Sequence, residues 1–387
     1  MKNKKKICAF IGSRANYGSL KSAMLSIKSH PNLELLVVAA ASSLLDKDGR
    51  VRDIIQQDGF VIDEELYMLL GGENPLTMAK STGLGIVETA TILERHKPDF
   101  ILVVGDRFEV MSFVIAAAYM NIPIAHTMGG EVTGTIDESI RHAITKFSHL
   151  HFVASAEASE RVEKLGEHRD RIFNVGCPRV DIAKDVLEAK HQFDLHALSQ
   201  LGVGYDIDLN SEFLLVSQHP VTTEFNSAAQ QVSATLQAVD DIGMPAIWLW
   251  PNADAGSGNI SKQLRIWRER GRAKLIRFVK NFDTESYMYL MSKASCLIGN
   301  SSSGIREGAF IGTPVVNIGT RQNSRERARN VLDVPNDHKA IVNAVRKQIA
   351  HGRYESEHLY GAGDAGENVA QILANIDFVN VQKMITY

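Results

Sequence analysis

The sequence predicts an α/β protein made of two doubly wound, Rossmann-like domains. Short apolar runs alternate with longer segments of helical periodicity along almost the whole chain. Most of these runs are apolar on successive residues, as expected for parallel strands that are covered on both faces. There are eleven such runs, more than one doubly wound sheet usually accommodates, and this number favours two similar domains.

The first half of the chain has six expected strands with helices between them, which is the rhythm of a parallel sheet. The expected strands are residues 6–11, 35–40, 100–104, 122–126, 150–154 and 172–175. The expected helices are residues 18–29, 78–95, 108–120, 139–147 and 157–165. We therefore expect a first domain over residues 1–178.

A second series of strands follows a polar stretch at residues 188–196. Its expected strands are residues 213–217, 246–250, 274–278, 296–299 and 315–318. This series predicts a second Rossmann-like domain over residues 179–364. Residues 367–378 have the pattern of an amphipathic helix, and the pattern alone leaves its packing partner open.

The composition argues against several classes of protein. The chain has 387 residues, of which 44% are hydrophobic and 22% charged, so disorder is not expected. The 42 Lys and Arg residues are balanced by 45 Asp and Glu residues, unlike in a basic nucleic-acid-binding protein. Cys8, Cys177 and Cys296 are isolated thiols, which argues against a disulfide framework or a Cys-rich zinc site. No run suits a membrane span or a signal peptide, so we expect a soluble, cytoplasmic protein without a nucleic-acid or membrane partner.

Polar loops follow two of the expected strands in the first half. In an open α/β sheet, ligands bind outside the carboxyl ends of the strands. Residues 12–18 are mostly small and would let the backbone approach a ligand, with Arg14 in reach of a phosphate. An ordinary strand-to-helix turn would also explain this loop. Asp106 and Arg107 place a carboxylate beside a guanidinium, which suits the handling of protons and phosphate, although a capped helix with an exposed arginine is the alternative.

A glycine-rich loop follows the expected strand 122–126 and leads into an acidic helix start. Residues 127–137 contain three glycines together with Glu131. Asp137 and Arg141 are spaced i, i+4, so both side chains lie on one helix face. A capped helix with one surface ion pair, worth a few tenths of a kcal/mol, would not need so long a glycine-rich loop. We therefore expect this segment to carry chemistry.

Three loops in the second half have features of a nucleotide site. His219 and Asn252 each follow an apolar strand. Ser301 and Ser302 lie between a strand and a helix, where successive amides and hydroxyls form an anion cradle suited to a diphosphate. Glu307, about one turn into that helix, is placed to accept two hydroxyls of a ribose. Helix capping without a ligand would explain the serines alone, whereas three such loops at one sheet edge favour a nucleotide site.

These loops are similar to the motifs of a known family. The most specific stretches are Gly105-Asp106-Arg107-Phe108, Gly129-Gly130-Glu131 through Ser139-Ile140-Arg141-His142-Ala143-Ile144, His219-Pro220-Val221-Thr222-Thr223, and Gly299-Asn300-Ser301-Ser302 through Gly319-Thr320-Arg321-Gln322. The chain resembles the hydrolysing UDP-N-acetylglucosamine 2-epimerases of the sialic-acid and legionaminic-acid pathway type. The similarity runs from about residue 6 to beyond residue 330.

The resemblance implies a fold, a reaction and an assembly. The fold is the B-type glycosyltransferase architecture, in which two Rossmann-like domains face a cleft and the last helix, about residues 365–387, returns to the first domain. The family converts a UDP-linked 2-acetamido sugar and water into the free manno-configured sugar and UDP. The resemblance also implies a homodimer or homotetramer, and a reaction that requires neither a metal nor another cofactor.

Carried over by position, the resemblance implies site residues. The catalytic residues would be Asp106, Asp137 and Arg141, with Glu131 as a further acid. The nucleotide-sugar site would use Arg14, Arg107, His219, Asn252, Ser301, Ser302, Glu307 and Arg321. One residue departs from the pattern, because Met128 stands where the family usually has a catalytic glutamate, and methionine cannot transfer a proton. Either Glu131 or Asp137 replaces that glutamate, or the acid/base work is distributed differently, or the activity is weak.

The chemistry defines what such a site must supply. The hydrogen on C2 of the sugar is not acidic, but it can leave if the anomeric bond to UDP breaks at the same time. The site then needs a base near C2, cations around the diphosphate, and an acid/base group that directs water onto the glycal intermediate. We expect Asp106 and Asp137 to share the proton transfers while Arg141 holds one carboxylate ionised.

Three other functions remain open from the sequence. A glycosyltransferase of the same fold would share the nucleotide loops, and a non-hydrolysing epimerase would keep UDP on its product. A catalytically weak sugar-nucleotide-binding protein would be consistent with Met128. The sequence also leaves open whether the sugar is N-acetylglucosamine or a 4-acetamido-6-deoxy relative such as diacetylbacillosamine, and whether the nucleotide is UDP or GDP.

Overall fold

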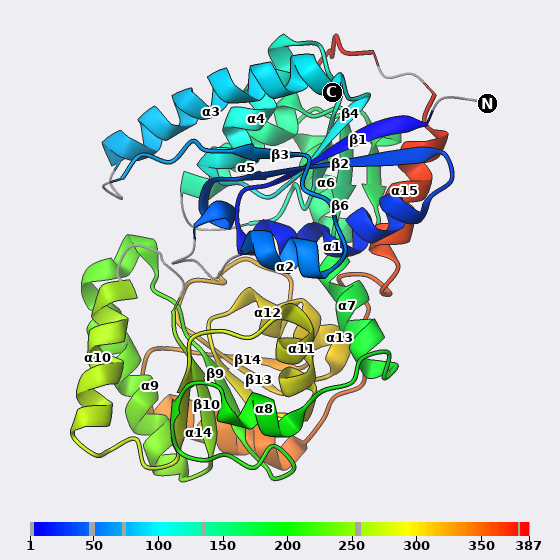
Figure 1. Ribbon diagram of the computed structural model, residues 1–387. Coiled ribbons are helices and arrows are strands. Elements are labelled where there is room, and N and C mark those ends of the chain that lie inside the picture. Colours follow the sequence, from blue (N-terminus) through cyan, green and yellow to red (C-terminus); the bar gives the residue numbers. More distant parts are fainter. Residues whose placement is uncertain are drawn as a thin grey trace. The chain divides into compact units, whose positions relative to one another are not determined.

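The computed structural model describes residues 4–45, 51–71, 75–132, 136–251, 257–377 and 380–386. The chain divides into two compact units (Figure 1). The first unit comprises Met1–Glu131, Ile136–Asp181 and Gly361–Tyr387, and the second comprises Val132–Thr135 and Ile182–Tyr360. No helix among the described residues is both long and apolar enough to cross a membrane.

The first unit is built on a seven-stranded parallel sheet, which confirms the predicted fold class. Its strands are β1 (Lys5–Ile11), β2 (Leu33–Ala40), β3 (Glu64–Leu66), β4 (Phe100–Val104), β5 (Ile124–Thr127), β6 (Leu150–Val153) and β7 (Ile172–Asn174). Their spatial order is β3-β2-β1-β4-β5-β6-β7. The order reverses between β1 and β4, so the loops after these two strands diverge and leave room for a ligand at the carboxyl edge.

Helices connect the strands of the first unit. They are α1 (Arg14–Ser29), α2 (Val51–Gln57), α3 (Pro75–His96), α4 (Phe108–Tyr119), α5 (Ile136–Phe147) and α6 (Ala156–Lys164), with 3-10 turns at η1 (Ala41–Leu44) and η3 (Arg169–Arg171). Helix α7 (Pro178–Leu187) runs from the first unit into the second, and α15 (Ala365–Asn375) belongs to the first unit. The prediction that residues 12–18 form a loop is wrong, because α1 already begins at Arg14. Its start is set by Ser13, whose side chain accepts a hydrogen bond from the Asn16 amide.

Helix α15 completes the first unit although it comes near the end of the chain. It packs against α1, and the two ribbons lie side by side in Figure 1. A side chain at Gly366 would collide with the backbone of Ser22, its nearest atom being 2.5 Å away. The Asp181 carboxylate accepts hydrogen bonds from the amides of Ala365 and Gly366 at 3.0 and 2.7 Å. The carboxylate therefore anchors the start of α15 to the rest of the unit.

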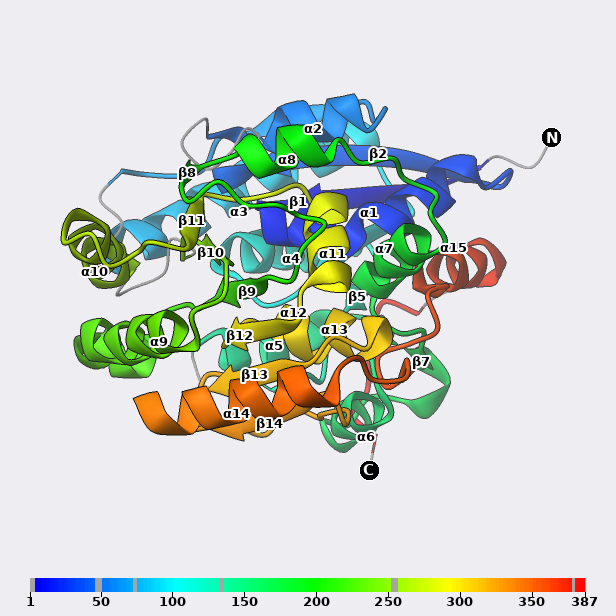
Figure 2. The ribbon, with the colours of Figure 1, turned by 90° about the horizontal axis from the view of Figure 1, so that it is seen from below.

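The second unit has its own sheet, in the order β14-β13-β12-β9-β10-β11-β8. The strands are β8 (Val203–Gly204), β9 (Leu214–Ser217), β10 (Ala246–Leu249), β11 (Ile276–Val279), β12 (Cys296–Gly299), β13 (Val315–Ile318) and β14 (Val331–Val334). All pairs are parallel except β11 with β8. The order reverses between β9 and β12, which lie side by side in Figure 2, and places the carboxyl-end loops of these strands at a second candidate ligand edge.

The second unit buries a core around Trp248, to which the helices over residues 228–242, 257–269 and 338–351 contribute. The helices of this unit are α8 (Leu195–Gln200), α9 (Ala228–Ile242), α10 (Ser257–Glu269), α11 (Thr284–Lys293), α12 (Ser302–Ile305), α13 (Glu307–Ile311) and α14 (His338–His351), with a 3-10 turn at η4 (Thr222–Ser227). The strands β9, β10, β12 and β13 are buried along their whole length. This burial is why their sequences are apolar on successive residues.

Candidate functional site

In the first unit, the Asn16 side chain joins the loop after β1 to the last residue of β4. Its side-chain oxygen accepts a hydrogen bond from the Gly12 amide at 3.2 Å, and its amide nitrogen donates to the Val104 carbonyl at 3.4 Å. Arg14 is the first residue of α1, and Asp106 and Arg107 lie in the loop directly after β4. The structure thus brings these three predicted residues to the edge where the strand order reverses.

A buried carboxylate holds Arg107. The Arg107 Nε donates to Glu109 Oε1 at 2.6 Å, and Glu109 is 1% exposed whereas the Arg107 side chain is 42% exposed. A Cβ atom added at Gly12 would lie 2.5 Å from the Glu109 side chain, so that side chain packs directly against the loop that precedes Arg14. Glu109 therefore orients a solvent-accessible guanidinium, the group best suited to a phosphate.

Arg141 connects the acidic segments of the first unit. Its side chain is 2% exposed, although it carries a full positive charge. One nitrogen forms an ion pair with Asp106, and the other donates to the Glu131 carbonyl at 2.6 Å and lies 4.0 Å from a Glu138 carboxylate oxygen. A buried guanidinium needs such partners on every side. Arg141 thus joins the loop after β4, the loop after β5 and the start of α5. These contacts go beyond the prediction, which only placed Arg141 and Asp137 on one face of a helix.

Met128 occupies a strained position at the end of β5. Its φ angle is +64°, in the left-handed region that side-chain-bearing residues avoid at a cost of about 1–2 kcal/mol. The residue is 6% exposed, and its amide donates to the Phe152 carbonyl at 2.8 Å. The thioether gives this position no proton to transfer, so any proton transfer depends on other acids, and Asp106, Glu131 and Asp137 are the predicted ones. Glu131 is itself buried, at 8% exposure.

In the second unit, Asn300 fastens the loop after β9 to the loop after β12. Its side chain accepts a hydrogen bond from the His219 amide at 2.7 Å and donates to the His219 carbonyl at 2.9 Å. Burial, assisted by the positive charge of Arg321, lowers the pKa of His219 to about 3. The imidazole is therefore neutral at physiological pH and can offer one donor and one acceptor.

The Asn300 backbone also holds the loop after β13. Its carbonyl accepts hydrogen bonds from an Arg321 side-chain nitrogen at 3.1 Å and from the side-chain amide of Gln322 at 2.9 Å. The preceding Gly299 has a φ angle of +134°, and an added Cβ there would lie 2.1 Å from the Ser217 carbonyl oxygen. Close approach of β9 and β12 therefore requires glycine at this position. His219, Arg321 and the serine loop consequently lie at one edge of the second sheet.

The serine loop differs from its predicted form. Ser301 caps α12, which starts at Ser302, and a second short helix, α13, starts at Glu307 after a break at Arg306. Glu307, expected about one turn into a helix, is instead the first residue of α13. Glu307 is fully buried, and Arg306 donates to the Ser302 hydroxyl at 3.1 Å.

The remaining predicted residue, Asn252, lies outside the described residues. Sequence reasoning missed Glu109, Asn300, Arg306 and Gln322 as residues that shape the two edges. Their signal was weak, because each acts mainly on a neighbouring loop. Among the residues with described positions, no three His, Cys, Asp or Glu side chains gather in a way that could hold a metal ion.

Two parallel α/β units of this topology belong to the proteins with a B-type glycosyltransferase-like fold. The crystal structure of UDP-GlcNAc 2-epimerase from Neisseria meningitidis bound to UDP-GlcNAc superposes with a TM-score of 0.80 at 18% identity, and covers 95% of this chain and 99% of that one. A family model described as UDP-N-acetylglucosamine 2-epimerase matches residues 25–374. The chain belongs to this UDP-N-acetylglucosamine 2-epimerase family, which confirms the resemblance seen in the sequence.

Two relatives have a higher sequence identity to this chain than that structure has. UDP-N,N'-diacetylbacillosamine 2-epimerase (hydrolyzing) of Legionella pneumophila is 31% identical over 372 residues, which are 96% of each chain. GDP/UDP-N,N'-diacetylbacillosamine 2-epimerase (hydrolyzing) of Campylobacter jejuni is 32% identical over 333 residues, which are 86% of this chain and 84% of that one.

Proposed function

We propose that this protein is a hydrolysing 2-epimerase. It takes a UDP-linked 2-acetamido sugar and water and releases the free manno-configured sugar and UDP. The observation that carries the proposal is the buried Arg141, which joins Asp106 to the acid-bearing loop of Glu131. A transferase that only moves a sugar to an acceptor has no need of such an assembly, whereas removal and return of a proton at C2 requires positioned carboxylates.

The proposed reaction has two stages. A carboxylate removes the C2 proton while the C1–O bond breaks, so that the electron pair of the C2–H bond forms the C1=C2 double bond and UDP leaves with the C1–O pair. Water then adds across this double bond, placing a hydroxyl on C1 and a proton on the opposite face of C2. Asp106 and Asp137 share these proton transfers in this proposal. Glu131, in the loop after β5, is the third candidate acid. Net consumption of one water gives the free sugar.

The leaving diphosphate needs positive charge and hydrogen-bond donors. Arg107 supplies a guanidinium that Glu109 holds in place while much of it remains exposed. In the second unit, Arg321 and the hydroxyl groups of the α12 loop bind the diphosphate, and the neutral His219 contributes a hydrogen bond without adding charge. Arg14, Asn252 and Glu307 complete the nucleotide-sugar contacts in this proposal.

The first sugar to test is the diacetylated, 6-deoxy one. Relatives at 31% and 32% identity are named as hydrolysing epimerases of UDP- or GDP/UDP-N,N'-diacetylbacillosamine. Their names support a 2,4-diacetamido substrate for this chain, with UDP-N-acetylglucosamine as the second candidate. In keeping with its family, the enzyme is proposed to act as a homodimer or homotetramer without a cofactor.

In the deciding experiment, the protein is incubated in D2O without an acceptor. The substrates are UDP-N,N'-diacetylbacillosamine, its GDP-linked form and UDP-N-acetylglucosamine. Free nucleotide is measured by chromatography, and the released sugar by NMR. We expect equimolar nucleotide and a free manno sugar that carries deuterium at C2. A product that still carries UDP would instead indicate a non-hydrolysing epimerase, and retention of the original C2 hydrogen would exclude the elimination. Tight UDP binding without turnover of any sugar would favour the binding protein.

A further inference from the structure

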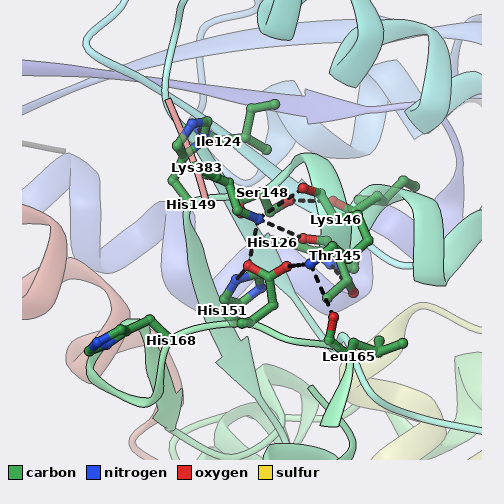
Figure 3. Close-up of polar contacts among 12 residues, drawn as sticks. Ile124, His126, Thr145, Lys146, Ser148, His149, His151, Leu165, His168 and Lys383 are labelled. Atoms are coloured by element: carbon green, nitrogen blue, oxygen red, sulfur yellow. Dashed lines mark hydrogen bonds and ion pairs between the residues drawn. The ribbon is translucent and has the colours of Figure 1, made fainter. Parts of the chain in front are cut away.

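His126 is a buried histidine that the proposed reaction does not use. It lies in β5 and is fully buried. Its Nε2 lies 2.9 Å from the Gly105 carbonyl oxygen, and its Nδ1 lies 3.4 Å from the Thr145 hydroxyl. Figure 3 shows His126 close to Thr145 at the end of α5. The imidazole and its two hydrogen-bond partners, Gly105 and Thr145, therefore form a bridge between the loop after β4 and α5.

Each end of this bridge is next to a residue of the candidate site. Gly105 directly precedes Asp106 in the chain. Thr145 lies four residues, or about one turn, after Arg141, so the two side chains are on the same face of α5. Asp106 and Arg141 form the ion pair described above. The bridge thus connects the two backbone segments that carry this pair.

The chemistry of the two partners defines the tautomer of the ring. A carbonyl oxygen only accepts, so Nε2 must carry the proton that is donated to Gly105. Burial lowers the pKa of His126 to about 3, so the ring is neutral and Nδ1 is an acceptor for the Thr145 hydroxyl. Both hydrogen bonds consequently persist at any pH at which the enzyme is expected to work.

A third site segment packs on the same bridge. A Cβ atom added at Gly129 would lie 3.1 Å from His126 Nδ1 and 3.1 Å from Thr145 Oγ1. The backbone of Gly129 therefore rests directly on this pair. Because Met128 precedes Gly129 and Glu131 follows two residues later, the path of the acid-bearing loop depends on the same two side chains.

We infer that His126 is a positioning residue of the reaction, which holds Asp106 opposite Arg141 and supports the Gly129 loop through its hydrogen bonds to Gly105 and Thr145. This inference rests on the proposed function. His126 moves no proton and touches no reacting atom. Its loss misplaces the carboxylate, and a displacement of about 1 Å from the reactive geometry can reduce turnover about 100-fold.

The test separates the two hydrogen bonds. His126→Gln keeps a donor near the position of Nε2, whereas His126→Asn keeps an acceptor near Nδ1 and loses the donor to Gly105. Thr145→Val removes the hydroxyl with little change of shape. The matched control is His149→Asn, because His149 is also buried, but it accepts from the Ile124 amide and contacts the Val381 carbonyl instead of a site loop. Each variant is measured for kcat, KM, UDP affinity and thermal unfolding.

We expect kcat of His126→Asn to fall about 10- to 100-fold, with KM and UDP affinity within about threefold of wild type. His126→Gln should recover most of that loss, and Thr145→Val should lose about 3- to 10-fold in kcat. His149→Asn should lower the unfolding temperature while kcat stays near wild type. Equal losses of kcat in His126→Asn and His149→Asn would overturn the inference, as would a loss that only follows the folded fraction. If His126→Asn does not fold, Thr145→Val decides by the same criteria.

A measurement without substrate tests the bridge by itself. Nitrogen-15 NMR of the wild-type histidines should show His126 protonated on Nε2 and not on Nδ1 from pH 5 to pH 8. A proton on Nδ1, or titration of His126 within this range, would refute the bridge. If wild-type protein turns over no sugar, the proposed function fails, whereas this NMR result still reports on the bridge.

Discussion

Replacing Lys383 with methionine is expected to destabilise the first unit by about 2–4 kcal/mol. The Lys383 ammonium lies 2.5 Å from Glu167 Oε2 and donates to the Lys146 carbonyl at 2.8 Å and the Thr145 carbonyl at 3.4 Å. It also donates to the Ser148 carbonyl, so one ammonium group caps the C-terminal end of α5 (Figure 3). Methionine keeps most of the length of the side chain but removes all of these contacts.

The magnitude follows from the environment of Glu167, whose side chain is 3% exposed. Burial alone would raise its pKa, but hydrogen bonds from His151, Lys146 and Lys383 outweigh burial and lower the pKa to about 2 from 4.5. That difference corresponds to about 3 kcal/mol, which is what remains of the three hydrogen bonds after the opposing effect of burial. Loss of one donor, added to the loss of bonds to helix carbonyls, gives the expected 2–4 kcal/mol, or a decrease of about 5–15 °C in Tm.

The assay is thermal and urea unfolding at pH 7, 5 and 3. Because the pKa of Glu167 is lower in the folded protein, its contribution to stability is present above about pH 4.5 and is lost as the pH falls toward 2. The difference between Lys383→Met and wild type should therefore shrink at pH 3. Met384→Ala is the control, since Met384 is 85% exposed in the same segment. A Lys383→Met protein within about 0.5 kcal/mol of wild type at pH 7 would refute the reasoning.

Three further predictions concern the two sheet edges. Gly299→Ala should destabilise the second unit by about 2–4 kcal/mol in urea unfolding, because its Cβ would meet the Ser217 carbonyl; an unchanged midpoint would contradict this. Asp106→Asn should reduce kcat about 100- to 10,000-fold while UDP affinity in calorimetry stays the same, and near-normal turnover would remove Asp106 from the mechanism. Arg321→Ala should weaken UDP binding about 10- to 100-fold in the same calorimetric assay, and unaltered affinity would exclude its proposed contact with the diphosphate.

Most of the strands that were predicted are buried on both faces, and the partly exposed edge strand β7 is an exception. The segments 100–104, 296–299 and 315–318 match the observed β4, β12 and β13 because uninterrupted apolar runs reflect complete burial. The strands that were missed, β3, β8 and β14, lie at sheet edges. They are short, polar or partly exposed, and edge pairing leaves little trace in the sequence.

The candidate site was predictable at the level of loops rather than contacts. Asp106 and Arg107 follow a buried strand, so the topology alone brings them to the carboxyl edge. The partnership of Arg141 with Asp106 was not predictable, since helical spacing reports only neighbours within α5. The side chains of His126 and Asn300 bind backbone groups of other residues, the Gly105 carbonyl and the His219 amide. Every residue has such groups, so the sequence does not indicate which of them a side chain will contact.

The return of α15 to α1 has a consequence for biosynthesis. A ribosome delivers the whole second unit before it delivers the pieces that complete the first. Until Ala365 and Gly366 emerge, the Asp181 carboxylate has no amides to accept from, and the apolar face of α1 that α15 covers stays open to solvent. The first unit therefore stays incomplete while the second unit is synthesised. Nascent chains halted before Gly361 should bind chaperones or aggregate more readily than full-length chains.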